Sequence, residues 1–407
     1  PWYVRSKSVA TNQWSEPISG LIKACLYLQD PDHLPAYNFG VRAFSASLLA
    51  SGNDGAYLEG FTYAQMSVNT LLKTVAAMKA SGDKRCSNMP FTQNSWRWFV
   101  AMPIDGISLV NCSDSKLSQL PKWQIETPNS SMIEAALVSD EQEALITMKS
   151  LFPKGDCSIS GIRYTDATIN KSFQELPSID PFKYFPSQQL LVWRSAWGRP
   201  SNPGIGLALW MKGGSLEAAN HGHRDQGQVS IYWNGFPILI DCGTPDYADP
   251  RIDTMFANVA GHGIMQVGAI LPRGVPVNAP IKIEQLDING GRATIDTTTA
   301  YKNTKKCTRE IQWEKIGKIN ITDFVEFTSK VNKNTEIYRF HTGSAQILDI
   351  TGEGKDWTIQ WGSTRITINA DKNIEVKQAQ WPDSTLPPFH HQVIMIYGLE
   401  DVINLEI

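Results

Sequence analysis

The sequence lacks the features of membrane-spanning, nucleic-acid-binding and zinc-finger proteins. No apolar run approaches the roughly 20 residues that cross a bilayer. A formal net charge of -3, with no block of like charge, provides no basic surface for nucleic acid. Six scattered cysteines contain no CxxC pair, so disulfides are permitted but not required. We therefore expect no membrane span and no nucleic-acid partner.

The start of the chain also lacks an initiator Met and a signal-peptide pattern. Because it begins at Pro1, we expect a processed or truncated product. What is present is a globular composition, with 42% hydrophobic and 19% charged residues. A chain of 407 residues exceeds one ordinary core, which favours two domains.

The first part of the sequence has apolar side chains at the three- and four-residue spacing of helices. Pro17 stands near an expected helix start. Short connections between the segments favour antiparallel helix pairs. The expected helical segments are 18–26, 41–49, 59–79 and 131–151.

After residue 185 the pattern changes to short runs rich in β-formers, separated by turn residues. Asn234-Gly235 lies between two apolar runs, which strongly indicates a hairpin. Many short strands of this kind predict an antiparallel sandwich. We therefore predict an α+β multidomain chain, with a helical domain at 1–185, a linker at about 152–186 and a β-sandwich domain at 186–407.

A cluster of metal-binding residue types follows in the β region. His221 and His223 are two residues apart on an expected extended segment, so their imidazoles face the same side. Asp225 extends this row and can orient a ligating histidine through its far nitrogen. Asp241 ends the hairpin, and His262 begins a later strand. Ligands of type His, Asp and His suit zinc with a position left open.

An ordinary explanation competes with this one. Paired histidines in a loop are often surface residues, and an Asp before Cys-Gly can simply form a turn. Short motifs give many false matches, so spacing alone leaves both interpretations open.

The order of the motifs points to a known family. Residues 221–225 read HxHxD, residues 241–247 read Asp-x-Gly-Thr-x-x-Tyr, and a histidine then starts a strand. This region, 213–268, resembles the heparinase II/III-like β domain, which carries these motifs in the same order. In metal-containing members, the second motif histidine, the hairpin aspartate and the later histidine ligate zinc.

The resemblance implies roles for the matching residues of this chain. Zinc would be held by His223, Asp241 and His262 in a mainly structural site. His221 would face the substrate, with Tyr247 positioned beside it. No organic cofactor is implied.

The helical part matches the same family in two places. Residues 54–63 (DGAYLEGFTY) resemble the DG…EGxxY segment, whose final tyrosine is catalytic and corresponds to Tyr63. Residues 11–14 (TNQW) are similar to an Asn-Asn-Trp or Asn-Asn-His segment on an earlier helix. Without the resemblance, a helical tyrosine is more often core, and Asn12 could equally cap a helix. The residues implied to act on substrate are Asn12, Gln13 and Tyr63 as catalytic groups and Trp14, Glu59 and Arg224 as substrate-binding groups.

Several departures from the family pattern matter. Trp14 stands where some alginate-type members have a catalytic His, which moves the base role to Tyr63 or His221. A frequent Tyr-Phe-Arg reads Met-Phe-Ala at 255–257, so one substrate-binding Arg is missing. Arg224 pairs with substrate carboxylates or sulfates, or is a plain surface Arg. The helical part is shorter than a full (α/α) toroid, which implies an incomplete one.

The implied reaction is β-elimination at a uronic acid of an acidic polysaccharide. A base removes the C5 proton, Asn12 and Gln13 stabilise charge on the carboxylate, and Tyr63 protonates the leaving C4 oxygen. His221 is the alternative base, because its ordinary pKa is near neutrality. Such substrates imply a periplasmic or secreted protein.

Three other functions stay open at this stage. An epimerase on the same scaffold would share C5 proton removal. A non-catalytic carbohydrate-binding or assembly protein would keep the fold without the chemistry. A metallohydrolase would use a zinc-bound water, although no HExxH motif supports it.

Overall fold

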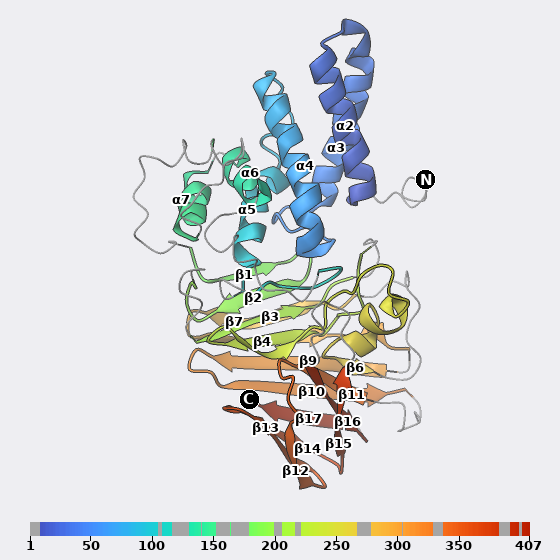
Figure 1. Cartoon of the computed structure of the whole chain (residues 1–407), viewed down its shortest axis with the longest axis vertical. Coiled ribbons are helices and arrows are strands. Elements are labelled where there is room, and N and C mark those ends of the chain that lie inside the picture. The colour runs from blue at the N-terminus through green and yellow to red at the C-terminus, as the bar shows by residue number, and fades with distance from the viewer. Residues whose placement is uncertain are drawn as a thin grey trace.

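The computed structural model describes residues 9–104, 108–115, 130–139, 141–151, 163, 179–198, 206–215, 221–266, 278–302, 304–328, 337–381, 391–398 and 401–407. Helices come first in the chain and lie above an antiparallel sandwich, as the sequence predicts (Figure 1). None of the described helices combines the length and apolar character needed to cross a lipid bilayer. The described helices are α2 (Asn12–Leu28), α3 (Leu34–Ala50), α4 (Gly60–Ala80), α5 (Pro90–Ala101), α6 (Ser130–Val138) and α7 (Gln142–Leu151).

Two sheets form the sandwich, and every described strand pair is antiparallel. The first sheet has the order β1-β2-β3-β4-β5-β11-β16-β15, with β6 beside β11, and the second has the order β12-β13-β14-β17-β10-β9-β8-β7. The strands of the first sheet are β1 (Phe182–Phe185), β2 (Leu190–Arg194), β3 (Leu207–Lys212), β4 (Val229–Trp233), β5 (Phe236–Ile240), β6 (Met265–Gln266), β11 (Ile337–Thr342), β15 (Glu375–Trp381) and β16 (His391–Tyr397). Those of the second are β7 (Ile281–Asp287), β8 (Gly290–Asp296), β9 (Thr304–Glu314), β10 (Ile319–Phe327), β12 (Asp349–Glu353), β13 (Asp356–Trp361), β14 (Thr364–Ala370) and β17 (Asp401–Glu406).

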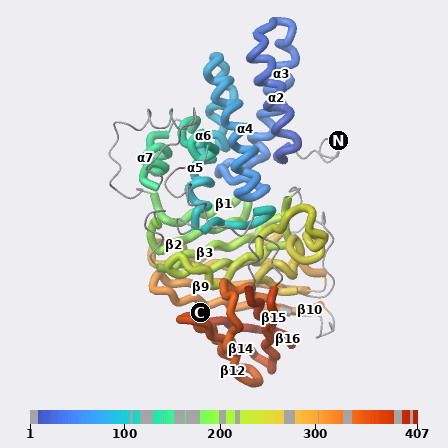
Figure 2. Tube along the Cα trace, viewed as in Figure 1, coloured from blue at the N-terminus to red at the C-terminus, as the bar shows by residue number. Residues whose placement is uncertain are grey.

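Strands β2, β3 and β4 of the first sheet are buried on both faces, which makes this part of the molecule three-layered. On β2, Leu190 and Val192 join the helical core, whereas Leu191 and Trp193 join the core between the sheets. Successive strand residues point to opposite faces, so a strand covered on both sides reads as one apolar run. Figure 2 shows β1, β2 and β3 of the first sheet below the helices and β9 of the second sheet below them, whereas β15 and β16 of the first sheet lie further down the long axis. The segments that carry the site therefore meet where the helices rest on the first sheet.

Some predicted boundaries were wrong. The segment 131–151 forms two helices, because the Ser139 hydroxyl bonds to Ala136 O and accepts from Glu141 N at the break between α6 and α7. Pro17 lies inside α2 and not at its start, since Thr11 is the N-cap residue. The predicted linker is largely outside the described residues, and its last part forms β1.

The predicted hairpin is confirmed. Asn234 and Gly235 both have positive φ, at 51° and 79°, as a tight two-residue turn between β4 and β5 requires. The Asn234 side chain also accepts from Gly206 N at 2.7 Å, which fixes the turn against the start of β3. Cys25, Cys86, Cys112, Cys242 and Cys307 are thiols that form no disulfide, and Cys157 lies outside the described residues.

Candidate active site

The phenol of Tyr63 lies flat against the imidazole of His221. Their ring centroids are 3.7 Å apart and their planes differ by 14°. Tyr63 belongs to the first turn of α4, whereas His221 precedes β4, 158 positions later in the chain by the difference 221 − 63. The structure thus brings together the two residues that the sequence nominated as acid and base.

Gly60 allows α4 to approach this closely. It has a φ of +78°, and a Cβ there would lie 2.6 Å from Cys112 O and 2.9 Å from Ser115 Oγ. Any larger residue would separate the helix start from segment 108–115. The glycine of the EGxxY motif therefore serves contact between α4 and that segment.

Asp114, on segment 108–115, is the centre of the hydrogen-bond network. Its Oδ2 lies 2.6 Å from His221 Nδ1 and accepts from Tyr247 Oη at 2.7 Å. Its Oδ1 lies 2.8 Å from His223 Nε2 and accepts from Thr244 Oγ1 at 3.3 Å. One carboxylate thus connects the HxHxD segment with the segment that follows β5.

Tyr63 and Tyr247 are joined by their hydroxyls, which are 2.6 Å apart. Because Tyr247 donates its proton to Asp114, it accepts from Tyr63. Tyr247 is 57% exposed, so this end of the network reaches the surface. The arrangement is a chain of hydrogen bonds from Tyr63 through Tyr247 to Asp114.

The electrostatics of these groups follow from burial and the network. Burial opposes ionisation of Asp114, but hydrogen bonds from His221 and His223 outweigh it and hold the pKa of Asp114 well below its ordinary value. Burial, with further contributions from Asp114 and Glu59, raises the pKa of Tyr63 despite its bond to Tyr247. Burial and the bonds to Tyr63 and Asp114 raise the pKa of Tyr247 far more. Near neutral pH, both phenols therefore hold their protons and Asp114 is a carboxylate.

Glu59 lies on the opposite edge of the His221 ring. Its Oε1 is 3.7 Å from His221 Nε2, while Oε2 accepts from Tyr57 Oη at 2.8 Å and from Asn12 N at 3.0 Å. The residue is fully buried, and burial raises its pKa against the effect of those two hydrogen bonds. Glu59 therefore fastens the start of α2 beside the site.

The start of α2 lies beside this region, because the backbone N–H of Asn12 donates to Glu59. Asn12 Oδ1 and Gln13 Oε1 are buried and have no hydrogen-bond partner among the described residues. Asn12 is the first residue of the helix and not its cap, because Thr11 occupies the cap position. Buried polar atoms of folded proteins usually have a hydrogen-bond partner, so a bound ligand is one explanation for these two oxygens.

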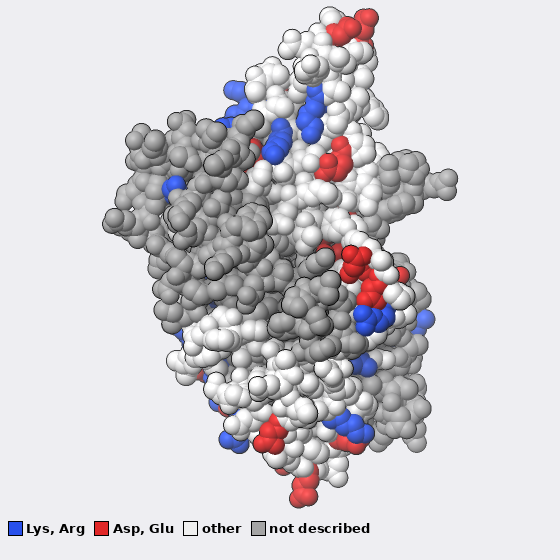
Figure 3. Space-filling model, viewed as in Figure 1, with Lys and Arg blue, Asp and Glu red and all other residues white. Residues whose placement is uncertain are grey.

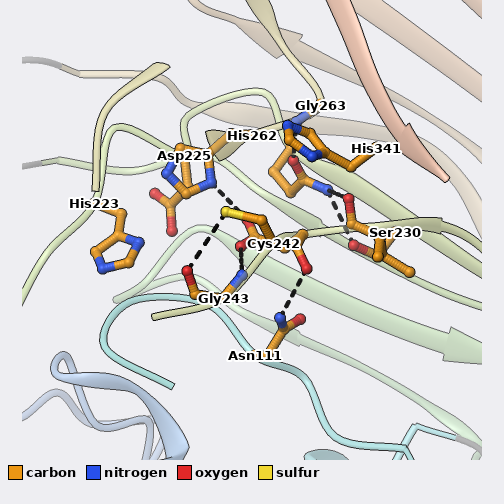
Figure 4. A network of polar contacts seen from close by, with 12 residues as sticks. Asn111, His223, Asp225, Ser230, Cys242, Gly243, His262, Gly263 and His341 are labelled. Atoms are coloured by element: carbon orange, nitrogen blue, oxygen red, sulfur yellow. Dashed lines mark hydrogen bonds and ion pairs between the residues drawn. The ribbon is translucent and has the colours of Figure 1, made fainter. Parts of the chain in front are cut away.

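The predicted zinc ligands lie together, but not as a completed metal centre. Within the described part of the chain, no group of three or more His, Cys, Asp or Glu side chains is arranged to hold a metal ion. Asp241 is fully buried, and its Oδ2 lies 2.7 Å from His262 Nδ1 while Oδ1 accepts from Gly243 N at 2.8 Å. Figure 4 shows His262 near His223 and Asp225.

The chemistry of the remaining atoms nevertheless fits zinc. His223 Nδ1, Asp225 Oδ2 and His262 Nε2 are buried and have no hydrogen-bond partner in the described ranges. The rings of His223 and His262 have centroids 5.3 Å apart. Two imidazole nitrogens and a carboxylate oxygen form a donor set that zinc accepts. Here the free carboxylate atom belongs to Asp225, whereas the prediction assigned that part to Asp241.

Comparison with known proteins identifies the β region. Residues 182–384 match the family described as heparinase II/III-like, C-terminal. Over these residues the β-sandwich resembles a heparinase II/III-like C-terminal domain. No curated protein matches the chain.

Solved structures resemble the whole chain in fold. A crystal structure of heparinase III superposes with a TM-score of 0.73 at 13% identity, covering 98% of this chain and 61% of that one. Heparan sulfate lyase HepC from Pedobacter heparinus gives a TM-score of 0.66 at 12% identity, covering 97% of this chain and 60% of that one. At these identities the likeness establishes the fold, a helical toroid-type part followed by a β-sandwich. The chain spans about three fifths of the length of these structures.

In the region that matches the heparinase II/III-like model, four residues of segment 241–247 make contacts that shape the site. Asp241 holds His262, and Thr244 lies 3.1 Å from His223 Nε2. Gly243 adopts a φ of +69°, which lets its N–H reach back to the Asp241 carboxylate. Tyr247 then reaches Asp114.

Arg224 and Trp14, two of the predicted substrate-binding residues, are less accessible to solvent than a substrate-binding role predicts. Arg224 is 8% exposed, so it is not a plain surface Arg. Trp14 directs its indole N–H toward Ala43 O of α3 at 3.5 Å, which is a contact between helices. Their roles toward substrate stay predictions.

Asp114 was missed by the sequence reasoning. It stands in the stretch Asn111-Cys112-Ser113-Asp114-Ser115, which reads as an ordinary turn. Its partners follow 107 and 109 positions later. Nothing in the local sequence signals that contact.

Proposed function

We propose that this protein is a polysaccharide lyase that cleaves a uronic-acid-containing polysaccharide by β-elimination. The observation that carries the proposal is the stacked pair of Tyr63 and His221, with the Tyr63 hydroxyl bonded to Tyr247. It combines a proton donor with a proton acceptor at one position, which elimination next to a carboxylate needs. The heparinase II/III-like domain and the fold shared with lyases support it.

The reaction balances without a cofactor taking part. A base removes the proton from C5, next to the uronate carboxylate, and the C5–H electron pair forms the C4–C5 double bond. The C4–O bond breaks, and its electrons leave with the glycosidic oxygen, which takes a proton. The products are a 4,5-unsaturated uronate and a new chain end.

We assign the acid, the base and the charge-stabilising groups of this reaction to different residues of the site. Tyr63 holds its proton near neutral pH, because burial raises its pKa, so it protonates the leaving oxygen. His221 is the base, or Tyr63 itself where proton and leaving group lie on the same face. Asn12 and Gln13 supply amide groups that meet the charge developing on the carboxylate.

Glu59 and the charged surface refine the substrate proposal. Because Glu59 is fully buried next to His221, we assign it to orienting that ring and not to touching the sugar.

On the face shown in Figure 3, the described Lys and Arg residues form small separate groups. Binding of an acidic chain therefore depends on placed side chains more than on a broad basic surface. The names of the similar structures favour heparan sulfate as the first substrate to test.

A zinc ion belongs to the proposal as a structural element. His223 Nδ1 and His262 Nε2 would bind it, with a carboxylate from Asp225 or Asp241. When bound, zinc would hold the segments that carry His221 and Tyr247 in place. Because such polysaccharides occur outside the cytoplasm, we expect the protein to act in the periplasm or outside the cell.

The test is incubation of the full chain with alginate, heparan sulfate, chondroitin sulfate, hyaluronan and bacterial exopolysaccharides, followed by ultraviolet absorbance of the unsaturated product. We expect absorbance to rise with at least one uronate polymer. Tyr63→Phe keeps the stacked ring and removes the hydroxyl, so kcat should fall about 10²- to 10⁴-fold.

Tyr27→Phe, at an 87% exposed position, is the matched control and should retain wild-type activity. Loss of the C5 proton to solvent without absorbance would identify an epimerase instead. Binding without any conversion would identify a carbohydrate-binding protein.

A further inference from the structure

We propose that Asp114 is a positioning residue that fixes the tautomers of His221 and His223 in opposite senses. The inference rests on the proposed function for its catalytic meaning, but its structural content is independent of it. Asp114 lies outside the HxHxD, EGxxY and Asp-x-Gly-Thr-x-x-Tyr motifs, on the segment after α5.

Each carboxylate oxygen of Asp114 has one imidazole nitrogen and one hydroxyl within hydrogen-bond distance. A carboxylate has no proton to donate and can only accept. His221 Nδ1, at 2.6 Å from Oδ2, must therefore carry a proton. His223 Nε2, at 2.8 Å from Oδ1, must carry one as well.

His221 is therefore protonated at Nδ1 and His223 at Nε2, so the two imidazoles are opposite tautomers. A neutral imidazole has one N–H, so the other nitrogen is an acceptor. In His221 the acceptor is Nε2, the nitrogen on the Glu59 side. In His223 it is Nδ1, one of the buried atoms without a partner in the described residues. His221 is thus prepared to take a proton at Nε2, and His223 is prepared to donate a lone pair at Nδ1.

The surroundings of Asp114 hold the carboxylate in this orientation. Its backbone N–H donates to His221 O at 3.1 Å, and Thr244 N donates to Ser115 O at 3.2 Å. Tyr247 adds a second donor on Oδ2, and Thr244 adds one on Oδ1. Each oxygen therefore receives one histidine and one hydroxyl, which an isosteric amide cannot satisfy, because one of its two ends is an NH2 donor.

The direct test is 15N NMR of the labelled full chain at a pH where the histidines are neutral. Two-bond 1H–15N correlations distinguish protonated from unprotonated ring nitrogens. We expect His221 to be protonated at Nδ1 and His223 at Nε2. A wild-type His221 protonated at Nε2, or a His223 protonated at Nδ1, would overturn the inference whether or not the protein is a lyase.

The functional test is Asp114→Asn. The amide should switch the tautomer of at least one of the two histidines and lower kcat by about 10²- to 10⁴-fold, as loss of a tautomer-fixing carboxylate does in other enzymes, with KM changed less than about threefold. Asp246→Asn, at an exposed position of the adjoining segment, is the control and should behave as wild type.

An Asp114→Asn variant with both tautomers and kcat unchanged would contradict the positioning role. Absence of lyase activity in the wild type, with the tautomers as expected, would contradict the proposed function and leave the role of Asp114 in fixing tautomers intact.

Discussion

At the scale of single residues, the side chains of the site have contacts on more than one side. His221 lies between Asp114 and Glu59 and beneath the ring of Tyr63. Such enclosure restricts the imidazole to one orientation before substrate arrives. Preorganised groups do not need to reorient as charge develops, which is a large part of enzymatic rate enhancement.

The carboxylate that completes the zinc site can be identified by substitution. We expect Asp225→Asn to lower zinc affinity directly, because Asp225 Oδ2 is the buried carboxylate atom without a partner in the described residues. Asp241→Asn should lower it about 10- to 100-fold through loss of the bond that orients His262, the usual effect of removing an outer-shell partner. Zinc content of the purified variants, measured by mass spectrometry after dialysis against a competing chelator, checks both.

Asp249→Asn is the control for these variants, since Asp249 bonds to partly exposed Arg251. Full zinc binding by Asp225→Asn together with none by Asp241→Asn would restore Asp241 as the direct ligand. A wild-type protein that binds no zinc would contradict the metal proposal altogether.

At the scale of elements, the second sheet supports the site through one buried ion pair. Arg309 on β9 faces Asp323 on β10, with contacts of 2.7 Å and 2.8 Å. Arg309 Nη1 also donates to Gly227 O at 2.7 Å and to Gly263 O at 2.5 Å. Those carbonyls follow the HxHxD motif and His262, so a strand of the distant sheet fixes both segments.

This support predicts different outcomes for single and double substitutions. Arg309→Met should destabilise the fold by about 3–5 kcal/mol, because it leaves Asp323 as an unpaired buried charge. The double variant Arg309→Met, Asp323→Leu should recover much of that stability, since no charge remains buried. It should not recover activity, because both glycine carbonyls still lack their donor.

Denaturant unfolding and kcat of the three proteins test this prediction. Recovery of activity along with stability would show that Arg309 serves the fold alone.

Helix α3 is fastened to the end of α4 by a pH-sensitive contact. Asp83 Oδ2 accepts from Tyr37 Oη at 2.7 Å and lies 2.6 Å from Arg85 Nη2. The hydrogen bonds from Arg85 are the main cause that lowers the pKa of Asp83 from 3.8 to about 2. A carboxylate with a depressed folded-state pKa stabilises the fold above its unfolded pKa, and the effect is lost as pH falls through the folded value.

We therefore expect Asp83→Asn to reduce stability by about 1 kcal/mol near neutral pH, a modest value because Arg85 is half exposed. The difference from wild type should shrink between about pH 4 and pH 2. Asp32→Asn, at an exposed position, should leave stability nearly unchanged throughout. A difference between Asp83→Asn and wild type that is independent of pH would exclude this contact as its cause.

The sequence predicted the elements whose patterns are local. Asn234-Gly235 identified its hairpin, because a positive φ at two consecutive residues favours those types. Strand β9 is hard to predict from a binary pattern, because Arg309 occupies a buried position that such a pattern assigns to an apolar residue. Helix α5 was missed although its less buried residues Gln93, Asn94 and Arg97 recur at helical spacing and so mark a polar face.

At the scale of the whole molecule, the site exists only where the helical part meets the first sheet. Tyr63 comes from α4, Asp114 from the segment between α5 and α6, and His221 from the segment before β4 of the sandwich. Asp54 reinforces this junction by accepting from Ser187 N at 2.8 Å and Ser187 Oγ at 2.7 Å. The predicted catalytic residues were identified through ordered motifs, whereas Asp114 depends on a contact across the junction that only the folded chain creates.

The central claim is that this junction catalyses elimination and not hydrolysis. Digestion of the accepted polysaccharide in H2(18)O, followed by mass spectrometry of the oligosaccharides, tests it most directly. Elimination breaks the C4–O bond without adding water, so the account predicts products that carry no 18O from cleavage and non-reducing ends lighter by one water than those of a hydrolysed chain. Products with one 18O per cleavage and saturated ends would contradict it.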